Sequence, residues 1–503
     1  MSYQYQLIVI GSGSAGKDAA ILAARAGQHV LLVEKESLGG TCFHHGSYAI
    51  RALRACAMHY QTAEDSSRFG LSVDLLETGW ADWTNTQRRV SARLTEDLSR
   101  TLESLGAQVR FGIARLLNPN EIEISDPYGA HERIAAENIV IATGSRPAFS
   151  STKGSKILNS SQMLKNTEIP GYLLIIGGGY VGCEFASIYR TLGARVTLIE
   201  ERESLLPSWD RVAGVQIAES LEKQGVTVHL NTKVDLPTPD TWTARPVFNV
   251  NGTVISPDLT LIATGRKPNV EELGLESIGL AGDTFIPVNE KMATTQRNVF
   301  AVGDVNGLAL LDSVAFAQAR AAVETVLGKS ARFDLRWIPR CVHTDPPVAS
   351  VGWTEREASA AGHDFEVLAD TVHLVTDDDR SVVDPEPLQI RLVVQPEART
   401  LLGCQAVGAK AAEIVNLAAT ALSTGLSVTQ LAGLAMVHPS ASETLVRCLQ
   451  SRFDSKLVGE GSYLFADLDD VTADEEQMAV AAGAIQATGI RFVGRRGVER
   501  DGQ

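Results

Sequence analysis

The residues best suited to redox chemistry lie in the segment GGTCFHHGSYAIRAL, residues 39–53. Cys42 supplies a thiol, and the thiolate is the form of cysteine that attacks sulfur and binds metals. The segment follows a predicted strand and opens a predicted helix, whose N-terminus would stabilise a thiolate. Five positions after Cys42 stands Ser47, whose hydroxyl cannot form a disulfide. The segment therefore offers one thiol without the second thiol that a local disulfide needs.

A histidine and a carboxylate form a second candidate pair near the end of the sequence. His438 begins the motif HPSASE, and Glu443 ends it. An imidazole that a carboxylate orients is a general base, and it lowers the pKa of a thiol when the two form an ion pair. The chain thus contains two of the groups that thiol chemistry uses, a thiol and a candidate base.

The other histidines are expected to have no metal-binding role. His44 and His45 follow Cys42 in the pattern C-x-H-H, which is poor spacing for a metal in the absence of a second ligand cluster. His343 has no visible partner in the sequence and is expected to be structural. We therefore predict no metal site.

Two glycine-rich turns must position these groups. In the first, Gly11, Gly13 and Gly16 follow the apolar run Leu7–Ile10, and Glu34 ends the next apolar run. The first glycine permits the turn, the second lets the backbone approach a pyrophosphate, and the third lets the helix pack on the strand. The helix N-terminus favours phosphate, and the terminal acid can bind a ribose. The pattern predicts a dinucleotide-binding unit.

The same unit recurs later in the chain with equal spacing. Gly177, Gly179 and Gly182 follow the apolar run Leu173–Ile176, and Glu200 ends the next strand. Two such units imply two dinucleotides, and the natural pair is a flavin and a nicotinamide.

The acid of the second unit bears on which nicotinamide binds. Glu200 and its neighbour Glu201 would repel a 2′-phosphate, and Arg202 is the only nearby cation. NAD is therefore favoured over NADP.

Composition limits the classes of partner. The chain has 503 residues, of which 44% are hydrophobic and 21% charged, and its net charge of −15 argues against nucleic-acid binding. No apolar run is long enough to span a bilayer, and the N-terminus is predicted to be a strand and not a signal peptide. Six scattered cysteines fit a reducing cytoplasm better than a disulfide scaffold. We expect a cytoplasmic protein of two to four domains.

Taken together, the motifs resemble those of the pyridine nucleotide-disulfide oxidoreductases, the family of dihydrolipoamide dehydrogenase and glutathione reductase. The resemblance covers about residues 4–450. It is carried, in order, by the first glycine turn, GGTC, ATG at 142–144, the second glycine turn, ATG at 263–265, TTQRNVFAVGDV at 294–305, IPRCVHTDPPVASVGWTE at 338–355 and HPSASE.

The resemblance implies an α/β fold with two Rossmann-like dinucleotide-binding domains and an α+β C-terminal dimerisation domain, assembled as a homodimer. The implied domains are FAD-binding at 1–150 and 270–335, NAD-binding at 151–269 and interface at 336–452, followed by a C-terminal extension at 453–503. Within this extension, Thr472 and Glu475 form a capping-box pattern that predicts a short helix.

The resemblance also assigns cofactor contacts. Asp304 would meet the ribityl chain of FAD, Glu184 would lie near the nicotinamide and flavin N5, and Arg51 stands where a lysine normally pairs with that acid. The expected cofactor-binding residues are Gly11, Gly13, Gly16, Glu34, Lys35, Gly40, Thr41, Arg51, Ala142, Thr143, Gly144, Gly177, Gly179, Gly182, Glu184, Glu200, Gly265, Gly303 and Asp304.

The active site departs from the family pattern, which has Cys-x4-Cys where this chain has Cys42 and Ser47. By resemblance, Cys42 is the thiol that exchanges with substrate sulfur, and the missing thiol is the one that stacks on the flavin. His438 and Glu443 would serve the flavin of the partner subunit. These four residues are the expected catalytic set.

Three enzymatic functions are consistent with this set. We favour an FAD-dependent NAD(P)H oxidoreductase that passes electrons from NADH through FAD directly to a small, quinone-like acceptor. A thiol or disulfide oxidoreductase that uses Cys42 and His438 follows closely. A soluble NAD(P) transhydrogenase matches the Cys42 segment but usually lacks the histidine, and Glu200 disfavours NADP. A redox-sensing nucleotide-binding module is the non-enzymatic alternative.

Overall fold

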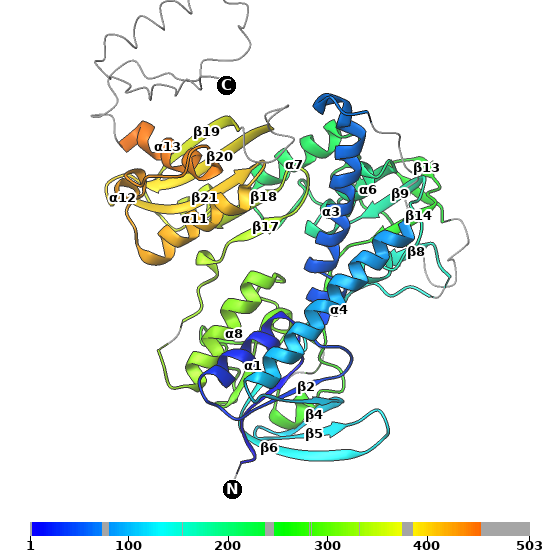
Figure 1. Ribbon diagram of the computed structural model, residues 1–503, viewed down its shortest axis with the longest axis vertical. Coiled ribbons are helices and arrows are strands. Elements are labelled where there is room, and N and C mark those ends of the chain that lie inside the picture. The colour runs from blue at the N-terminus through cyan, green and yellow to red at the C-terminus, as the bar shows by residue number, and fades with distance from the viewer. Residues whose placement is uncertain are drawn as a thin grey trace, which may run out of the picture. The chain divides into compact units, whose positions relative to one another are not determined.

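The computed structural model describes residues 3–72, 80–152, 154–236, 246–280, 282, 284–330, 332–374 and 386–453 (Figure 1). They belong to one compact unit that ends at Phe453. The helix predicted near Thr472 lies outside the described residues.

The first sheet contains the first glycine turn. Its order is β3-β2-β1-β6-β5-β4, with β16 also paired to β6. Strands β3, β2, β1, β6 and β16 run parallel, whereas β5 and β4 pair antiparallel at the other edge. Leu7 to Ile10 are all buried, as expected for a strand covered on both faces. The bounds are β1 Tyr5–Ile10, β2 Val30–Glu34, β3 Gln108–Phe111, β4 Ile113–Asn118, β5 Glu121–Ser125, β6 His131–Ile141 and β16 Val299–Ala301.

The second sheet repeats this plan around the second glycine turn. Its parallel order is β11-β10-β9-β14-β8. The strands are β8 Ile157–Asn159, β9 Tyr172–Ile176, β10 Arg195–Ile199, β11 Thr227–His229 and β14 Leu259–Ile262. Strand β7, Ser145–Pro147, pairs with β15, Arg266–Pro268, so the segments after the two ATG motifs lie side by side. A hairpin of β12 Phe248–Val250 and β13 Thr253–Ile255 completes this part of the described chain.

The third sheet is antiparallel, in the order β17-β18-β21-β20-β19, and forms the yellow and orange part of Figure 1. The strands are β17 Arg340–Val342, β18 Val348–Gly352, β19 Glu366–Leu374, β20 Glu386–Gln395 and β21 Thr400–Val407; the helices after them are α11 Ala411–Thr424, α12 Val428–Ala432 and α13 Ala441–Phe453. The predicted fold class, two Rossmann-like units and a C-terminal α+β unit, is confirmed.

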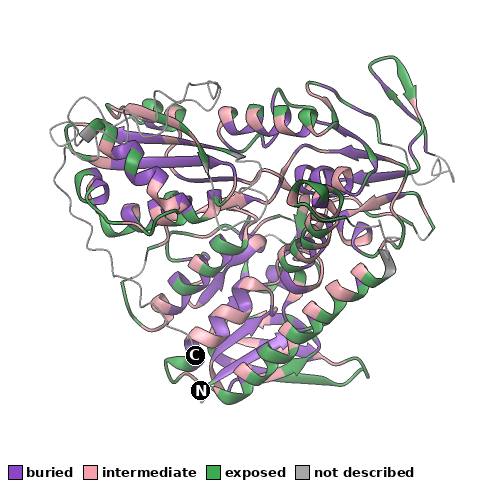
Figure 2. Ribbon diagram, turned by 45° about the horizontal axis from the view of Figure 1, so that its top comes forward, coloured by how far each residue is buried: buried purple, intermediate pink, exposed green. Residues whose placement is uncertain are grey.

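Most helices cover these sheets with one buried and one exposed face, whereas α6 and the central strands are buried along most of their length (Figure 2). Helix α1 packs beside α8, and α3 packs beside α4 and α6. Their bounds are α1 Ser14–Arg25, α2 Gly40–His44, α3 Ser47–Glu64, α4 Trp80–Ser104, α5 Ser160–Met163, α6 Tyr180–Thr191, α7 Arg211–Lys223, α8 Asp312–Val326 and α9 Glu355–Ala360. Short 3-10 turns are η1 Asp65–Phe69, η3 Leu275–Ile278, η4 Gly303–Asn306 and η5 Leu335–Trp337.

Candidate active site

A pocket of about 1000 Å³ lies between the two nucleotide-binding units and the third sheet. Segments far apart in the sequence meet there, from the first glycine turn to α11. The predicted residues that line it are Gly11, Gly13, Glu34, Lys35, Gly40, Thr41, Cys42, Ser47, Arg51, Ala142, Thr143, Gly144, Glu184, Gly303 and Asp304.

The first glycine turn has the geometry that a dinucleotide needs. Gly11 has φ +97°, and a Cβ there would lie 2.5 Å from the Ala142 carbonyl oxygen; a Cβ on Gly16 would lie 1.8 Å from the Gly11 oxygen. A Cβ on Gly13 would meet nothing within 4 Å, so space is open where a pyrophosphate would approach. Glu34, buried at the end of β2, accepts hydrogen bonds from the N–H of Ser12 at 2.9 Å and from its hydroxyl at 2.6 Å. These residues fit FAD.

The second turn repeats the first. A Cβ on Gly177 would lie 2.5 Å from the Ala263 oxygen, one on Gly182 would lie 1.9 Å from the Gly177 oxygen, and Gly179 faces open space. Glu200 accepts hydrogen bonds from the backbone N–H of Gly178 at 2.6 Å and of Arg202 at 2.9 Å. The turn fits a second dinucleotide, while Gly265 follows β14 at φ +137°.

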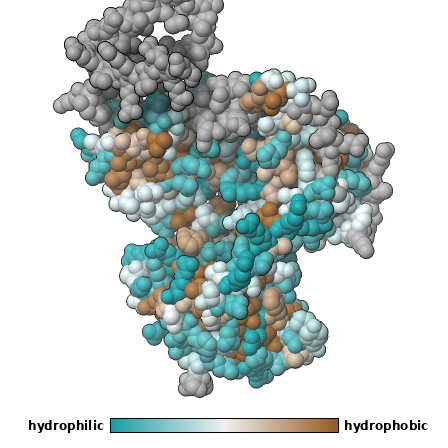
Figure 3. Space-filling view, viewed as in Figure 1, coloured by the Kyte–Doolittle hydropathy of each residue, from teal (hydrophilic) through white to brown (hydrophobic). Residues whose placement is uncertain are grey.

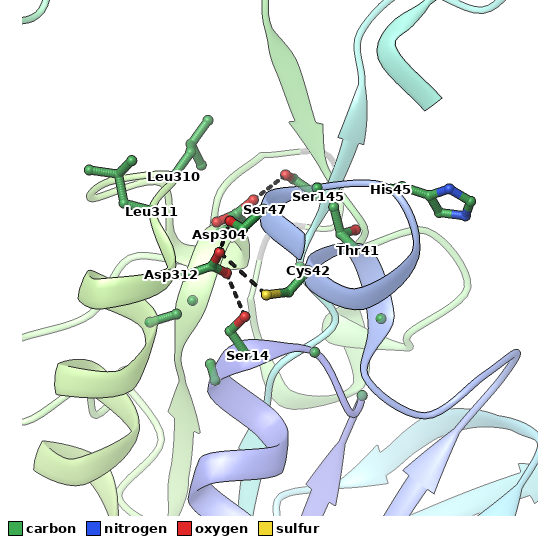
Figure 4. A pocket seen from close by; sticks show the side chains of 18 of the residues that line it. Ser14, Thr41, Cys42, His45, Ser47, Ser145, Asp304, Leu310, Leu311 and Asp312 are labelled. Atoms are coloured by element: carbon green, nitrogen blue, oxygen red, sulfur yellow. Dashed lines mark hydrogen bonds between the residues drawn. The ribbon is translucent and has the colours of Figure 1, made fainter. Parts of the chain in front are cut away.

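Asp304 belongs to a hydrogen-bonded group at the pocket wall (Figure 4). The hydroxyl of Ser145 donates to Asp304 at 2.6 Å, and Nε of Arg266 donates to the same hydroxyl at 2.6 Å. Burial raises the pKa of the Asp304 carboxyl, against the opposing effects of Ser145 and Arg266. The acid is therefore fixed in position by residues of both β7 and β15.

Cys42 lies in α2 with only 7% of its surface exposed. Its Sγ is 3.4 Å from Oδ2 of Asp312. Burial, followed by the negative charge of Asp312, raises the pKa of the Cys42 thiol to about 12. The expectation that a helix N-terminus stabilises the thiolate is therefore wrong, because α2 has only five residues and the thiol faces a carboxylate. All six cysteines are free.

Asp312 is a pocket residue that the sequence analysis missed. It is the first residue of α8, and its carboxylate accepts hydrogen bonds from the hydroxyls of Ser14, at 2.5 Å, and Ser47 as well as from Cys42. Figure 4 shows these side chains converging on it from different elements. The only sequence signal is an acid at the start of a helix, which is common for reasons of helix stability alone.

A second group of polar residues lies around Glu184, which α6 buries. Its Oε1 accepts the backbone N–H of His343 at 2.8 Å. Burial raises the pKa of Glu184 to about 7, although that hydrogen bond and the charges of Arg54 and Arg51 act to lower it. Glu184 therefore changes charge near neutral pH.

His343 lines the pocket with Arg51, a partner that the sequence did not reveal. Nη2 of Arg51 lies 2.9 Å from Nε2 of His343. Because a guanidinium has only N–H donors, this ring nitrogen is the acceptor. Burial, then Arg51 and Arg54, lowers the pKa of His343 to about 4, which keeps the imidazole neutral. Two residues 292 positions apart thus form one wall of the pocket.

His438 and Glu443 form the pair that their motif predicts, but away from this pocket. Nδ1 of His438 lies 3.0 and 3.1 Å from the two carboxylate oxygens of Glu443. Burial acts to raise the pKa of Glu443, but hydrogen bonds from His438 and the Ser440 backbone outweigh it and hold that pKa below its ordinary value. The His438 side chain is 68% exposed and does not line the pocket formed by the described residues of its own chain.

Comparison with known proteins places this site in a family. Residues 5–325 match the model of the pyridine nucleotide-disulphide oxidoreductases, and residues 338–448 match the dimerisation domain of the same family. That domain implies a homodimer. Within the described residues no helix has both the length and the apolar character needed to cross a membrane.

Curated relatives and solved structures agree with the family models. The chain is 35% identical to dihydrolipoyl dehydrogenase of Thermus scotoductus, over 89% of this chain and 97% of that one. It is 32% identical to dihydrolipoyl dehydrogenase of Chlorobaculum parvum, over 90% and 98%. The flavoprotein disulfide reductase RclA of Escherichia coli, solved as a Cu(II) complex, has 28% identity, 90% and 100% coverage and a TM-score of 0.76. This chain therefore belongs to the pyridine nucleotide-disulphide oxidoreductase family and is an FAD-dependent oxidoreductase similar to dihydrolipoyl dehydrogenase.

Proposed function

We propose that this enzyme oxidises NADH and passes the electrons through FAD directly to a small, quinone-like acceptor. The observation that carries the proposal is Ser47, which stands five positions after Cys42 where the family has its second redox cysteine. Without that thiol, the local disulfide that would compete for electrons cannot form. The high pKa of Cys42 adds support, because a protonated thiol is a poor nucleophile.

The proposed cofactor contacts follow from the two glycine turns. Gly11, Gly13 and Gly16 would hold the FAD pyrophosphate against the N-terminus of α1, and Glu34 would accept hydrogen bonds from its ribose. FAD, when bound, supplies the two-electron carrier between the nicotinamide and the acceptor. The other residues proposed for the flavin side are Lys35, Gly40, Thr41, Ala142, Thr143, Gly144, Gly303 and Asp304.

The second turn is proposed to bind NADH in preference to NADPH. Gly177, Gly179 and Gly182 shape the turn, and the carboxylate of Glu200, which the N–H of Gly178 holds, would accept the ribose hydroxyls and repel a 2′-phosphate. Gly265 is proposed to lie beside this cofactor. Glu184 and Arg51 would set the charge near the nicotinamide, since both line the pocket.

The domain boundaries and the shared site are proposals as well. We propose FAD-binding segments at 1–150 and 270–335, an NAD-binding domain at 151–269, an interface domain at 336–452 and an extension at 453–503. His438 and Glu443 would complete the pocket of the partner subunit, a role that the 68% exposure of the imidazole supports.

A relative supports a non-disulfide acceptor in this fold. The chain is 30% identical, over 90% of its length and 88% of the relative, to a protein of Vigna unguiculata named leghemoglobin reductase. That name gives a globin, and not a disulfide, as the acceptor of that relative. We propose an acceptor smaller than a protein here.

A thiol oxidoreductase is the second candidate, and the His438–Glu443 pair favours it. An oriented imidazole is the base that such chemistry uses, and the two side chains are within hydrogen-bond distance. In this alternative Cys42 would react through a mixed disulfide or a sulfenic acid.

An anaerobic NADH titration, followed by visible absorbance of the flavin, separates the two candidates. Direct transfer predicts that one equivalent of NADH bleaches each flavin, with no thiolate charge-transfer band. Consumption of a second equivalent before bleaching would reveal a sulfur acceptor and put the thiol candidate first. Equal rates with NADH and NADPH would contradict the proposed role of Glu200.

A further inference from the structure

Side chains from four helices of the nucleotide-binding units come together in the pocket at the carboxylate of Asp312. Asp312 begins α8, Ser14 begins α1, Cys42 lies in α2 and Ser47 begins α3. Each of the last three directs its side-chain oxygen or sulfur at the same carboxylate (Figure 4). The arrangement uses both carboxylate oxygens, since Ser14 contacts Oδ1 and the other two contact Oδ2.

This geometry requires Cys42 to be the donor. An ionised carboxylate only accepts hydrogen bonds, so the sulfur must carry its proton to make the contact at 3.4 Å. Loss of that proton would place a second negative charge next to the carboxylate, which is unfavourable. The contact therefore favours the thiol over the thiolate independently of burial.

The surrounding charges do not reverse this preference. A hydrogen bond from Ser14 and the charge of Lys17, both of α1, act to lower the pKa of Cys42, yet burial and Asp312 outweigh them. Asp304 of η4 and Tyr180 of α6 line the same pocket, and the charge of Asp312 acts to raise the pKa of both. An acid and a phenol thus add no positive charge to this part of the pocket.

Helix α4 contacts α2 and the segment before it through hydroxyl groups. Ser91 donates to the Phe43 carbonyl at 2.6 Å, and Thr95 donates to the Leu38 carbonyl at 3.2 Å. These bonds fix the backbone around Cys42 and leave Asp312 as the acid that the thiol contacts.

We propose that Asp312 is a positioning residue that holds Cys42 as a neutral thiol and holds Ser47 beside it, so that electrons bypass this cysteine. The inference rests on the proposed function, and it deepens it, because it explains why a cysteine remains in the pocket without acting as an electron acceptor. It attributes the lack of redox activity of Cys42 to the carboxylate of Asp312 as well as to the loss of a second thiol.

The test is the pH dependence of Cys42 alkylation in the flavin-containing enzyme. Iodoacetamide reacts with the thiolate, forming a carbon–sulfur bond and releasing iodide, and mass spectrometry of the Cys42 peptide follows the rate from pH 6 to 11. Because the pKa of the Cys42 thiol is about 12, the unmodified enzyme reaches no plateau in this range, and its rate is expected to rise with pH throughout. In Asp312→Asn the midpoint falls by at least about 1 unit, so the whole curve shifts to lower pH and alkylation at pH 8 rises about tenfold over the unmodified enzyme.

Two further variants make the result specific. Asp82→Asn removes an acid from the first turn of α4, so it serves as the matched control and leaves the midpoint unchanged. Asp312→Ser keeps a small polar residue at the start of α8 and reproduces the lowered midpoint if the Asn variant does not fold. An unchanged midpoint in a folded Asp312 variant overturns the proposal.

The outcome for Asp312 is separable from that of the proposed function. A lowered midpoint in the variant, together with consumption of a second NADH equivalent by the unmodified enzyme, would sustain the contact of Asp312 with Cys42 and reject direct transfer. An unchanged midpoint with a single equivalent would sustain direct transfer and reject the role of Asp312.

Discussion

Glu184 carries a carboxyl group that changes charge near neutral pH, since burial raises its pKa to about 7. Between the ordinary value of 4.5 and 7, the folded protein holds this proton more often than the unfolded chain does. The contribution to stability is therefore complete below 4.5 and is lost as the pH rises through 7. The infrared band of a protonated carboxyl should decline with a midpoint near pH 7 and be absent in Glu184→Gln.

Replacing Arg51 gives a second test of the pKa of Glu184. Its charge acts to lower the pKa of Glu184, so Arg51→Met should raise the midpoint of that band by about 1 unit. Arg68→Met is the control, because Arg68 lies in the last turn of η1, the element that follows α3, and does not line the pocket. A midpoint that stays at the unmodified value in Arg51→Met would show that Arg51 does not act on Glu184.

Ser47→Cys restores the Cys-x4-Cys spacing of the family, but we expect it to restore little disulfide chemistry. Asp312 would still contact Cys42, and disulfide formation needs a thiolate. NADH-dependent lipoamide reduction by the variant should stay below about one tenth of its quinone reduction. The double variant Ser47→Cys/Asp312→Asn should form the disulfide more readily, as thiol titration would show. Rapid lipoamide reduction by the single variant would contradict this account.

At the scale of elements, the glycines of the second turn divide into structural and cofactor-facing positions. Gly182→Ala would put a Cβ 1.9 Å from the Gly177 oxygen and separate α6 from its turn, whereas Gly179→Ala enters open space. We expect Gly182→Ala to lower the melting temperature by a few degrees, as for a loss of about 3 kcal/mol. Gly179→Ala should keep the melting temperature and weaken NADH binding, measured by titration of flavin reduction. Similar melting temperatures for both variants would argue against this division.

These two turns show how much of the fold could be predicted. Gly11 and Gly177 each stand between a buried apolar run and a helix, so local spacing alone determined the strand, the turn and the acid that follows. Helix α2 could not be predicted in the same way, because its five-residue length depends on where α3 and α4 pack. The pKa of Cys42 is raised by burial and by Asp312, and neither is visible in the local spacing around the cysteine.

At the scale of the whole molecule, motif order predicted the arrangement of the units, but contacts between them were not visible. Ser14 and Asp312 are 298 positions apart, and Arg51 and His343 are 292 apart. Such pairs depend on how the sheets assemble, and the spacing within each motif does not indicate which residue of another motif its side chains contact. The candidate cofactor residues, Arg51 among them, could therefore be named from the sequence, whereas Asp312, which acts on Cys42, and His343, whose backbone binds Glu184, could not.

The region around α11 and α12 carries hydrophobic surface in Figure 3, and here the chain exposes apolar side chains that a partner would cover. Val437 is 79% exposed and precedes His438, and Leu434 is 40% exposed. Monomeric proteins often expose single apolar residues, but in a dimerisation domain such side chains are expected where the two subunits meet.

Val437→Asp should therefore weaken the homodimer. A charge buried in an apolar interface loses its hydration, which costs several kcal/mol when no partner compensates. We expect the dimer dissociation constant to rise by at least about tenfold, as measured by sedimentation velocity over a range of concentrations. Tyr128→Asp is the control, since Tyr128 is 96% exposed in the turn between β5 and β6, outside the dimerisation domain. If both variants sediment like the unmodified dimer, Val437 lies outside the interface, and the proposal that the neighbouring His438 serves the partner subunit loses its main structural support.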